Sequence, residues 1–207
     1  MIRRWLSLFA GLICFGVGAG LIIRGNLGQG PWDVLHQGIA RQTGISIGVA
    51  SILTGIPVVL AWWPLGQRPG WGTLANLIVI GVVVDLTLQY VPVAQNVVIG
   101  TILLIGGILI TGFGSGMYLS SAMGAGPRDG LMLGIARRTG WSVRIVRTLI
   151  EVVVLTIGWL LGGNVGIGTL AFALGIGPAV QASLRLFKHV PSAQAQVPTE
   201  PTASPLA

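Results

Sequence analysis

Long apolar runs separated by short polar turns make up most of the chain, and this pattern predicts an all-α membrane protein. Each run is close to the roughly 20 residues that a helix needs to cross a bilayer. The predicted spans are residues 5–23, 46–63, 71–90, 97–119, 143–161 and 167–186. Residues 190–207 are rich in Pro, Ala, Ser, Gln and Thr. We predict a disordered tail there, because such a segment buries too little apolar surface to fold.

Two short segments between the spans begin with the same motif, Gly-x-Gly-Pro-x-Asp. Its residues are Gly28, Gly30, Pro31 and Asp33 in the first copy and Gly124, Gly126, Pro127 and Asp129 in the second. The copies lie 96 residues apart, and the same offset relates Gly72-Thr73 to Gly168-Thr169. A register held without insertion indicates a tandem duplication. We therefore divide the chain into a first repeat, residues 1–95, and a second, residues 96–189.

Each motif has the composition of a helix start. Proline is tolerated at the first helical position, because its missing N–H would have no partner there. An aspartate two residues later lies at the positive end of the helix dipole. Arg41 and Gly44 suit the end of the first helix, and Arg137 and Gly140 that of the second. The predicted helices are residues 31–43 and 127–139. At about 20 Å each, they are too short to cross a hydrocarbon core of about 30 Å.

Three spans in each repeat place the second repeat upside down, because an odd number of crossings reverses the chain direction. We therefore predict six spans in two inverted three-helix repeats. If the short helices also crossed, the chain would have eight spans. The positive-inside rule favours six, with both termini in the cytoplasm of a bacterial inner membrane. The inner side then receives Arg3, Arg4, Arg68, Arg128, Arg137, Arg138, Arg144, Arg147, Arg185 and Lys188, and the outer side Arg24 and Arg41.

Composition supports the membrane assignment and excludes other classes. The chain is 53% apolar and 8% charged, with a mean hydropathy of +0.85, values typical of an integral membrane protein whose partner is the lipid bilayer. The net charge of +7 follows from topology, so we expect no nucleic acid partner. Cys14 stands alone and the two histidines lie far apart. We therefore expect no disulfide, no metal site and no cofactor.

The motif residues resemble those of a known family. Residues 26–33 read Asn-Leu-Gly-Gln-Gly-Pro-Trp-Asp, and the Arg41-x-Thr43-Gly44 stop and the Gly72-Thr73 pair follow. These features are similar to the YczE/YyaS/YitT family of bacterial membrane proteins, and to its YczE-like members most closely. The resemblance covers roughly residues 5 to 187, without the soluble C-terminal domain of longer YitT-like members. It implies a plasma-membrane protein and offers no established reaction or substrate.

Asp33, Asp129 and Asp85 are the candidate binding residues, and each has two interpretations. In the first, the two short helices direct their N-termini to one site, where Asp33 and Asp129 bind a cation, proton or polar solute. In the second, both only cap their helices. Asp85 lies within a predicted span, which indicates a functional site or a residue near the outer interface. An anionic substrate is disfavoured by these carboxylates unless an arginine turns inward, the candidates being Arg24, Arg41, Arg128 and Arg137.

Two further patterns carry structural predictions. The glycine rows are Gly16, Gly18 and Gly20 in the first repeat and Gly112, Gly114 and Gly116 in the second. We expect them to let the first and fourth spans cross closely. Trp62, Trp63 and Trp71 flank a predicted cytoplasmic turn and suit interfacial anchors.

We expect a small-solute or cation- or proton-coupled transporter, or a channel-like permease. The alternative is a non-transporting accessory protein that assists a biosynthetic or export complex, with basic residues 128–147 as its docking surface. An enzyme is not expected, because the sequence holds no Ser/His/Asp set and no paired acids at helical spacing. A homo-oligomer remains open.

Overall fold

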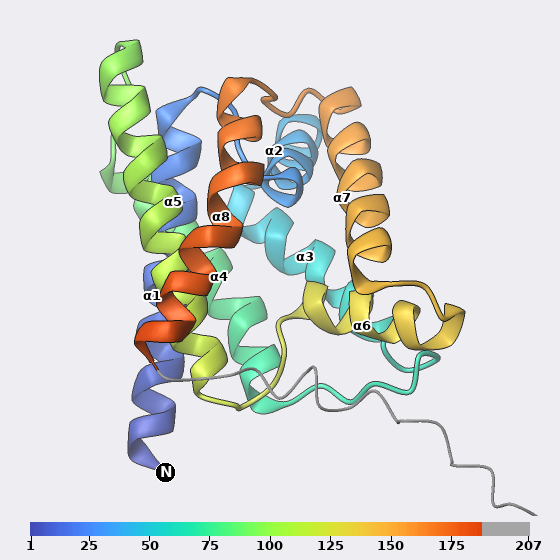
Figure 1. Cartoon of the computed structure of the whole chain (residues 1–207). Coiled ribbons are helices and arrows are strands. Elements are labelled where there is room, and N and C mark those ends of the chain that lie inside the picture. The colour runs from blue at the N-terminus through green and yellow to red at the C-terminus, as the bar shows by residue number, and fades with distance from the viewer. Residues whose placement is uncertain (188–207) are drawn as a thin grey trace, which may run out of the picture.

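The structure, a computed structural model, describes residues 1–187, and within them the fold is eight α-helices without a strand (Figure 1). The predicted all-α class is confirmed. The helices are α1 (Ile2–Gly25), α2 (Pro31–Thr43), α3 (Ile47–Leu60), α4 (Trp71–Tyr90), α5 (Val97–Ser120), α6 (Pro127–Thr139), α7 (Val143–Leu160) and α8 (Ile167–Leu186). The tail predicted for residues 190–207 lies outside the described residues, as does Lys188.

The two short helices begin and end where their capping residues stand. α2 begins at Pro31 after Gly30 as N-cap, and α6 begins at Pro127 after Gly126. Both end at a left-handed glycine that the missing Cβ permits, with φ of 76° in α2 and 74° in α6. Figure 1 shows α2 in the half of the molecule away from the N-terminus and α6 in the half toward it.

The core of the fold is the long contact between α1 and α5, with α4 packed against α1 and α8 against α5. Glycines make this contact close. A Cβ added at Gly18 would lie 2.6 Å from the carbonyl oxygen of Gly107, and one at Gly114 would lie 2.5 Å from that of Gly11. Backbones at this distance leave no room for side chains, as in membrane helices that pack through small residues.

The six glycines of the two rows do not all lie at the α1–α5 contact, contrary to the sequence prediction; within each row they face two different neighbouring helices. Only Gly18 and Gly114 face the α1–α5 contact. The four others face the outer helices: Gly16 and Gly20 lie against Val83 and Thr87 of α4, and Gly112 and Gly116 lie against Ala179 and Ser183 of α8. The reason is helical periodicity, because residues four apart share a face whereas residues two apart do not.

Four helices, α1, α4, α5 and α8, are long and apolar enough to cross a membrane. α2 and α3 together would add a fifth crossing as one broken span, bent by 112°. α7 is 18 residues long but carries Arg144, Arg147 and Glu151. Length and composition therefore give four to five spans within residues 1–187, where the sequence pattern predicts six.

Candidate functional site

The motif loop of the first repeat is fastened to the start of α8, in the second repeat. The Gly168 N–H donates to the carbonyl oxygen of Leu27 at 2.7 Å. The Gln29 N–H donates to Oγ1 of Thr169 at 3.2 Å. Gly28 has a φ of +107°, and a Cβ added there would lie 2.6 Å from the backbone nitrogen of Gly166. This position therefore requires glycine for both its backbone conformation and its close neighbour.

The motif loop of the second repeat is fastened to the start of α4, in the first repeat. The Gly72 N–H donates to the carbonyl oxygen of Met123 at 2.9 Å. The Thr73 hydroxyl donates to the carbonyl oxygen of Ala125 at 2.7 Å. Gly124 takes a φ of +133°. The Gly-Thr pair of each repeat therefore holds the motif loop of the other, and the two repeats form one unit at both ends of the molecule.

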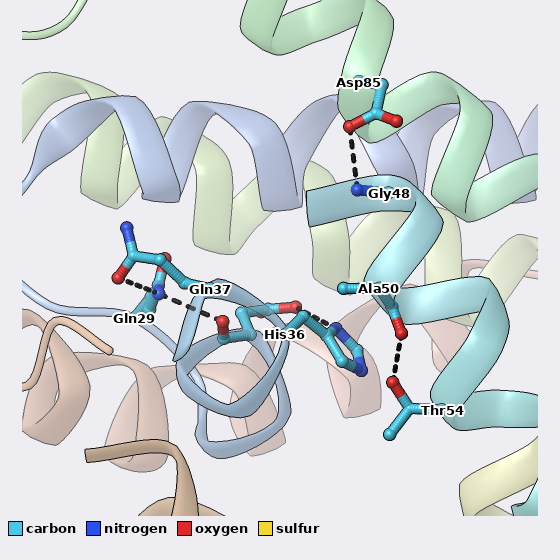
Figure 2. Close-up of polar contacts among 8 residues, drawn as sticks. Gln29, His36, Gln37, Gly48, Ala50, Thr54 and Asp85 are labelled. Atoms are coloured by element: carbon cyan, nitrogen blue, oxygen red, sulfur yellow. Dashed lines mark hydrogen bonds and ion pairs between the residues drawn. The ribbon is translucent and has the colours of Figure 1, made fainter. Parts of the chain in front are cut away.

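A buried amide network lies behind the first motif (Figure 2). Gln29 is 2% exposed. Its Nε2 donates to the carbonyl oxygen of Asp33 at 3.1 Å and to Oε1 of Gln37 at 3.0 Å. The same Oε1 accepts from the Asn164 N–H at 2.6 Å. Sequence reasoning missed Gln29 and Gln37, although an amide inside a glycine-rich turn that opens a helix is the signal that could have indicated Gln29.

The two motifs meet at the second of their two variable positions. Trp32 and Arg128 occupy the same place in the two copies, and the Arg128 guanidinium carbon lies 4.8 Å from the centroid of the Trp32 ring. The charge of Arg128 interacts with both Asp33 and Asp129. Within the described part of the chain, its guanidinium forms no hydrogen bond and no close ion pair. The starts of α2 and α6 therefore converge on one inward-facing arginine.

Asp129 is held by its own helix and by α5. Its Oδ2 accepts from the Tyr118 hydroxyl at 3.1 Å, and the Gly126 backbone N–H also bonds to the carboxylate. Burial raises the pKa of Asp129, while these hydrogen bonds and the nearby arginines lower it in part. Burial also lowers the pKa of Arg128, and the attraction of the two aspartates counteracts part of that change.

Asp33 lies in an equally enclosed position. Its side chain is 14% exposed, and its Oδ1 lies 3.9 Å from Nδ1 of His36, which is 3% exposed. This distance exceeds hydrogen-bond length. Nε1 of the neighbouring Trp32 is buried without a hydrogen-bond partner. The first motif therefore presents a carboxylate, an imidazole and an indole N–H whose polar atoms are only partly satisfied.

Asp85 lies apart from this site and has a structural partner. Its Oδ1 accepts from the Gly48 N–H at 2.7 Å (Figure 2). Its Oδ2 accepts from the Ser46 hydroxyl. Gly48 and Ser46 belong to the first turn and the N-cap of α3, so Asp85 caps α3 from the neighbouring helix α4. The structure therefore places Asp33 and Asp129 within the electrostatic reach of Arg128, while Asp85 serves a helix–helix contact.

The remaining predicted residues have local partners. Arg41 donates to the carbonyl oxygen of Gly162, and Arg147 pairs with Glu151 at 2.8 Å. Trp62 corrects one expectation: it is 2% exposed and donates from Nε1 to the carbonyl oxygen of Pro127 at 2.9 Å. It supports the start of α6 instead of lying at the interface, because α3 packs on α6 and carries Trp62 inward. Trp63 is 88% exposed.

The chemistry that this arrangement permits is binding of a polar group. A guanidinium offers five N–H donors, here on an indole face and beside two carboxylates. Within residues 1–187 no group of three His, Cys, Asp or Glu side chains could hold a metal ion. Two surface grooves of about 260 and 250 Å³ lie along α7 and do not reach the motif aspartates.

Comparison with known proteins gives relatives of unassigned function. Residues 2–185 match the model of a family of unknown function, DUF6198. The chain is 45% identical over 186 residues to an uncharacterized protein of Haemophilus influenzae, covering 90% of this chain and 85% of that one. It is 36% identical over 188 residues to the uncharacterized membrane protein YczE of Bacillus subtilis (89% and 86%), and 26% identical over 171 residues to YyaS of that organism (81% and 85%). No solved structure matches the chain.

Proposed function

The chain belongs to the DUF6198 family of unknown function, and from its geometry we propose that it is a small-solute permease of the bacterial inner membrane. The binding site consists of Asp33, Asp129 and Arg128, at the convergence of α2 and α6. The carboxylates bind a cation or proton. This ion is either the transported species itself or one whose movement drives transport of the solute.

The convergence of the two motifs through Arg128 and Trp32 is the observation that supports this proposal. Half-helices from two repeats that point their N-termini at one site are a recurrent feature of secondary transporters. Two carboxylates alone would disfavour an anionic solute. The inward guanidinium of Arg128 changes this balance, because it can receive a carboxylate or other anionic group. The proposed solute is therefore polar and small, and it need not be a cation.

The proposed architecture has six spans in two inverted repeats, with α3 and α7 crossing in addition to α1, α4, α5 and α8. The positions of α2 and α6 in opposite halves of the molecule support this arrangement (Figure 1). So does the matched exchange of hydrogen bonds between each motif loop and the Gly-Thr pair of the other repeat. The odd number of crossings per repeat supplies the inversion.

A non-transporting accessory role is the second candidate, and two observations favour it. The two grooves along α7 do not reach Asp33 or Asp129, and polar groups behind the first motif are tightly packed, with Gln29 2% exposed. In this alternative the motif junction stabilises the fold, and exposed basic residues near α6 and α7 dock a partner complex.

Substitution of the motif aspartates separates the two candidates. The protein is reconstituted in liposomes, and a panel of small polar solutes is screened by the charge movement each one induces. At least one solute is expected to give a current with the unaltered protein. Asp33→Asn and Asp129→Asn should each reduce that current at least tenfold while folding normally, because the charge itself is required. The double variant should be little worse than either single one, since the residues act as a unit.

Asp85→Asn is the matched control, because it makes the same change at a carboxylate outside the site; its current should persist. If no solute gives a current with any form of the protein, the permease proposal fails and the accessory role is favoured. Losses in Asp33→Asn and Asp129→Asn that follow lower stability alone would also contradict a transport site.

A further inference from the structure

The third helix of each repeat is packed differently, although the repeats share their sequence register. In the first repeat α3 packs closely on α4. A Cβ added at Gly48 would lie 2.0 Å from the carbonyl oxygen of Gly81, and Asp85 accepts a hydrogen bond from the Gly48 N–H. This contact therefore depends on a glycine at position 48.

In the second repeat α7 does not pack along α8, and the two helices stand apart in Figure 1. The residues at the corresponding positions explain the difference. Arg144 stands in place of Gly48, Gly177 in place of Gly81, and Gln181 in place of Asp85. No atom lies within 4 Å of the position that a Cβ on Gly177 would take. A face that α3 buries against its neighbour is therefore left open on α7.

Two nearly apolar grooves lie along α7: the larger runs beside α6, and the smaller lies on the face left open toward α8. The larger, about 260 Å³, is lined by Ile135, Trp141, Val146, Leu149, Ile150, Val153 and Val154. The other, about 250 Å³, is lined by Arg144, Ile145, Thr148 and Leu149. Leu149 belongs to both, so the grooves adjoin. Arg144 and Thr148 correspond to positions 48 and 52, which face α4 in the first repeat.

The dimensions of the larger groove suit a single lipid chain. From Val146 to Val154 a helix rises about 12 Å, close to the roughly 15 Å depth of one leaflet of the hydrocarbon core. Trp141 stands at the α6 end of the groove and is 54% exposed, as is typical of an aromatic residue at the headgroup level. In the six-span architecture proposed above, on which this inference rests, the groove begins at an interface and extends through one leaflet.

Arg144 supplies a positive charge at that end without a partner in the described residues. It is exposed and forms no hydrogen bond or ion pair there, whereas Arg147 is paired with Glu151. Arg144 also lies in the first turn of α7, where the helix dipole disfavours a cation. An anion beside Arg144 would neutralise the arginine charge and would itself interact favourably with the positive end of the helix dipole.

We propose that this face of α7 binds an anionic phospholipid, with one acyl chain along the groove and the headgroup phosphate on Arg144. An arginine–phosphate pair is a strong, charge-assisted contact, and the proposal is independent of transport. A second copy of the chain fits the charge less well. The four acidic residues of the described part already have partners: Asp33 and Asp129 beside Arg128, Asp85 on α3, and Glu151 on Arg147.

The test titrates the purified full chain in detergent with phosphatidylglycerol or phosphatidylcholine and counts bound lipids by native mass spectrometry. The unaltered protein should prefer phosphatidylglycerol. Arg144→Gln should weaken phosphatidylglycerol binding about fivefold, the factor equivalent to the roughly 1 kcal/mol that one arginine contributes near a membrane surface. Phosphatidylcholine binding should not change. Arg144→Lys should retain most of the preference, and Leu149→Trp, which fills the junction of the grooves, should weaken binding of both lipids.

Arg3→Gln is the matched control, because it removes the same charge from another exposed arginine, outside the grooves of α7. It should leave the lipid preference unchanged. Equal losses in Arg3→Gln and Arg144→Gln would overturn the proposal, because net charge would then explain the binding. An unchanged preference in Arg144→Gln would also overturn it. So would a dimer that Leu149→Trp dissociates without any change in bound lipid, which would assign the face to a second copy.

Discussion

The two motifs differ at two positions, Gln29/Ala125 and Trp32/Arg128, and the second of these joins the motifs. Trp32 and Arg128 are counterparts in the duplication. Two tryptophans or two arginines at this place could not form the cation–π contact observed at 4.8 Å, which in a desolvated position is worth about 2 kcal/mol. Divergence after duplication therefore introduced both a cation and its aromatic partner into a site that otherwise holds two carboxylates.

Asp85 allows a structural role to be tested at a single residue. Asp85→Ala should lower the free energy of unfolding by about 1–3 kcal/mol, because the Gly48 N–H and the Ser46 hydroxyl lose their acceptor. Asp85→Asn keeps one carbonyl oxygen for Gly48 and should cost about 1 kcal/mol or less. The measurement is equilibrium unfolding in detergent followed by circular dichroism.

Gln181→Ala is the control for Asp85→Ala, because Gln181 is the exposed counterpart in the second repeat. It should change stability by no more than about 0.5 kcal/mol. A loss in Gln181→Ala as large as that in Asp85→Ala would contradict the capping role. Loss of activity in a fully stable Asp85→Asn variant would instead indicate that Asp85 is part of the functional site.

Part of the candidate site could be predicted from the sequence. The rest depended on the direction in which side chains point and on contacts between the two repeats. Asp33 and Asp129 could be singled out because each follows a proline at a helix start, a local pattern. Arg128 was assigned to the cytoplasmic side, because the positive-inside rule counts charges in loops and cannot tell which way a side chain points. Gln29 and Gln37 were missed because their partners, Asp33 and Asn164, include a residue from the other repeat.

At the level of helices, the Gly-Thr pairs explain why the repeats cannot separate. Each pair begins a long helix of one repeat and binds the motif loop of the other. Sequence identified the pairs through the constant offset but gave them no role, because a repeat pattern shows which residues correspond and not which ones touch. The contacts lie across the repeats, at sequence separations that local propensity does not address.

Removing either threonine hydroxyl should destabilise the fold with little change of shape. Thr73→Val leaves the carbonyl oxygen of Ala125 without its donor, and Thr169→Val leaves the Gln29 N–H without its acceptor. Each should cost about 1–3 kcal/mol, measured as the free energy of unfolding in detergent. Thr87→Val is the control, because within residues 1–187 the Thr87 hydroxyl bonds only to the carbonyl oxygen of Val83 in its own helix. A cost for Thr87→Val equal to the other two would contradict the anchoring role.

The third helices of the two repeats, α3 and α7, make different contacts although their sequences correspond. Trp62 follows the end of α3 and fills the space beside Gly130 of α6. Its counterpart Gly158 instead lets α7 approach the backbone of Leu35 in α2, where a Cβ would lie 2.4 Å from the Leu35 nitrogen. A large side chain and a glycine at matched positions give two different helix contacts, so equal spacing in the sequence did not imply equal packing.

For the whole molecule, the helical class and the family resemblance were predictable, and the number of crossings was not. Apolar periodicity and Pro/Gly punctuation are local signals, and the resemblance to YczE-like and YyaS-like proteins is confirmed by the relatives found. The count of spans depends on α3, which is only 14 residues long, and on α7, which carries three charged residues. For such helices, composition alone does not decide between crossing and lying partway through the bilayer.

The six-span architecture predicts that both termini lie in the cytoplasm and that the turn between α4 and α5 lies outside. With Arg128 turned inward, nine basic residues remain on the proposed inner side against Arg24 and Arg41 on the outer side, a bias that still sets the orientation.

A phosphatase that is active only outside the cytoplasm is fused after Ala207 or within residues 91–96. The first fusion should be inactive and the second active by at least tenfold, with a cytoplasmically folding fluorescent protein giving the reverse pattern. Five spans, with α7 not crossing, would leave residues 91–96 outside and move the C-terminus outside, so both phosphatase fusions would be active while the N-terminus stayed inside. Activity at the C-terminus would therefore remove α7 from the membrane, and with it the odd number of crossings in the second repeat on which the inversion depends.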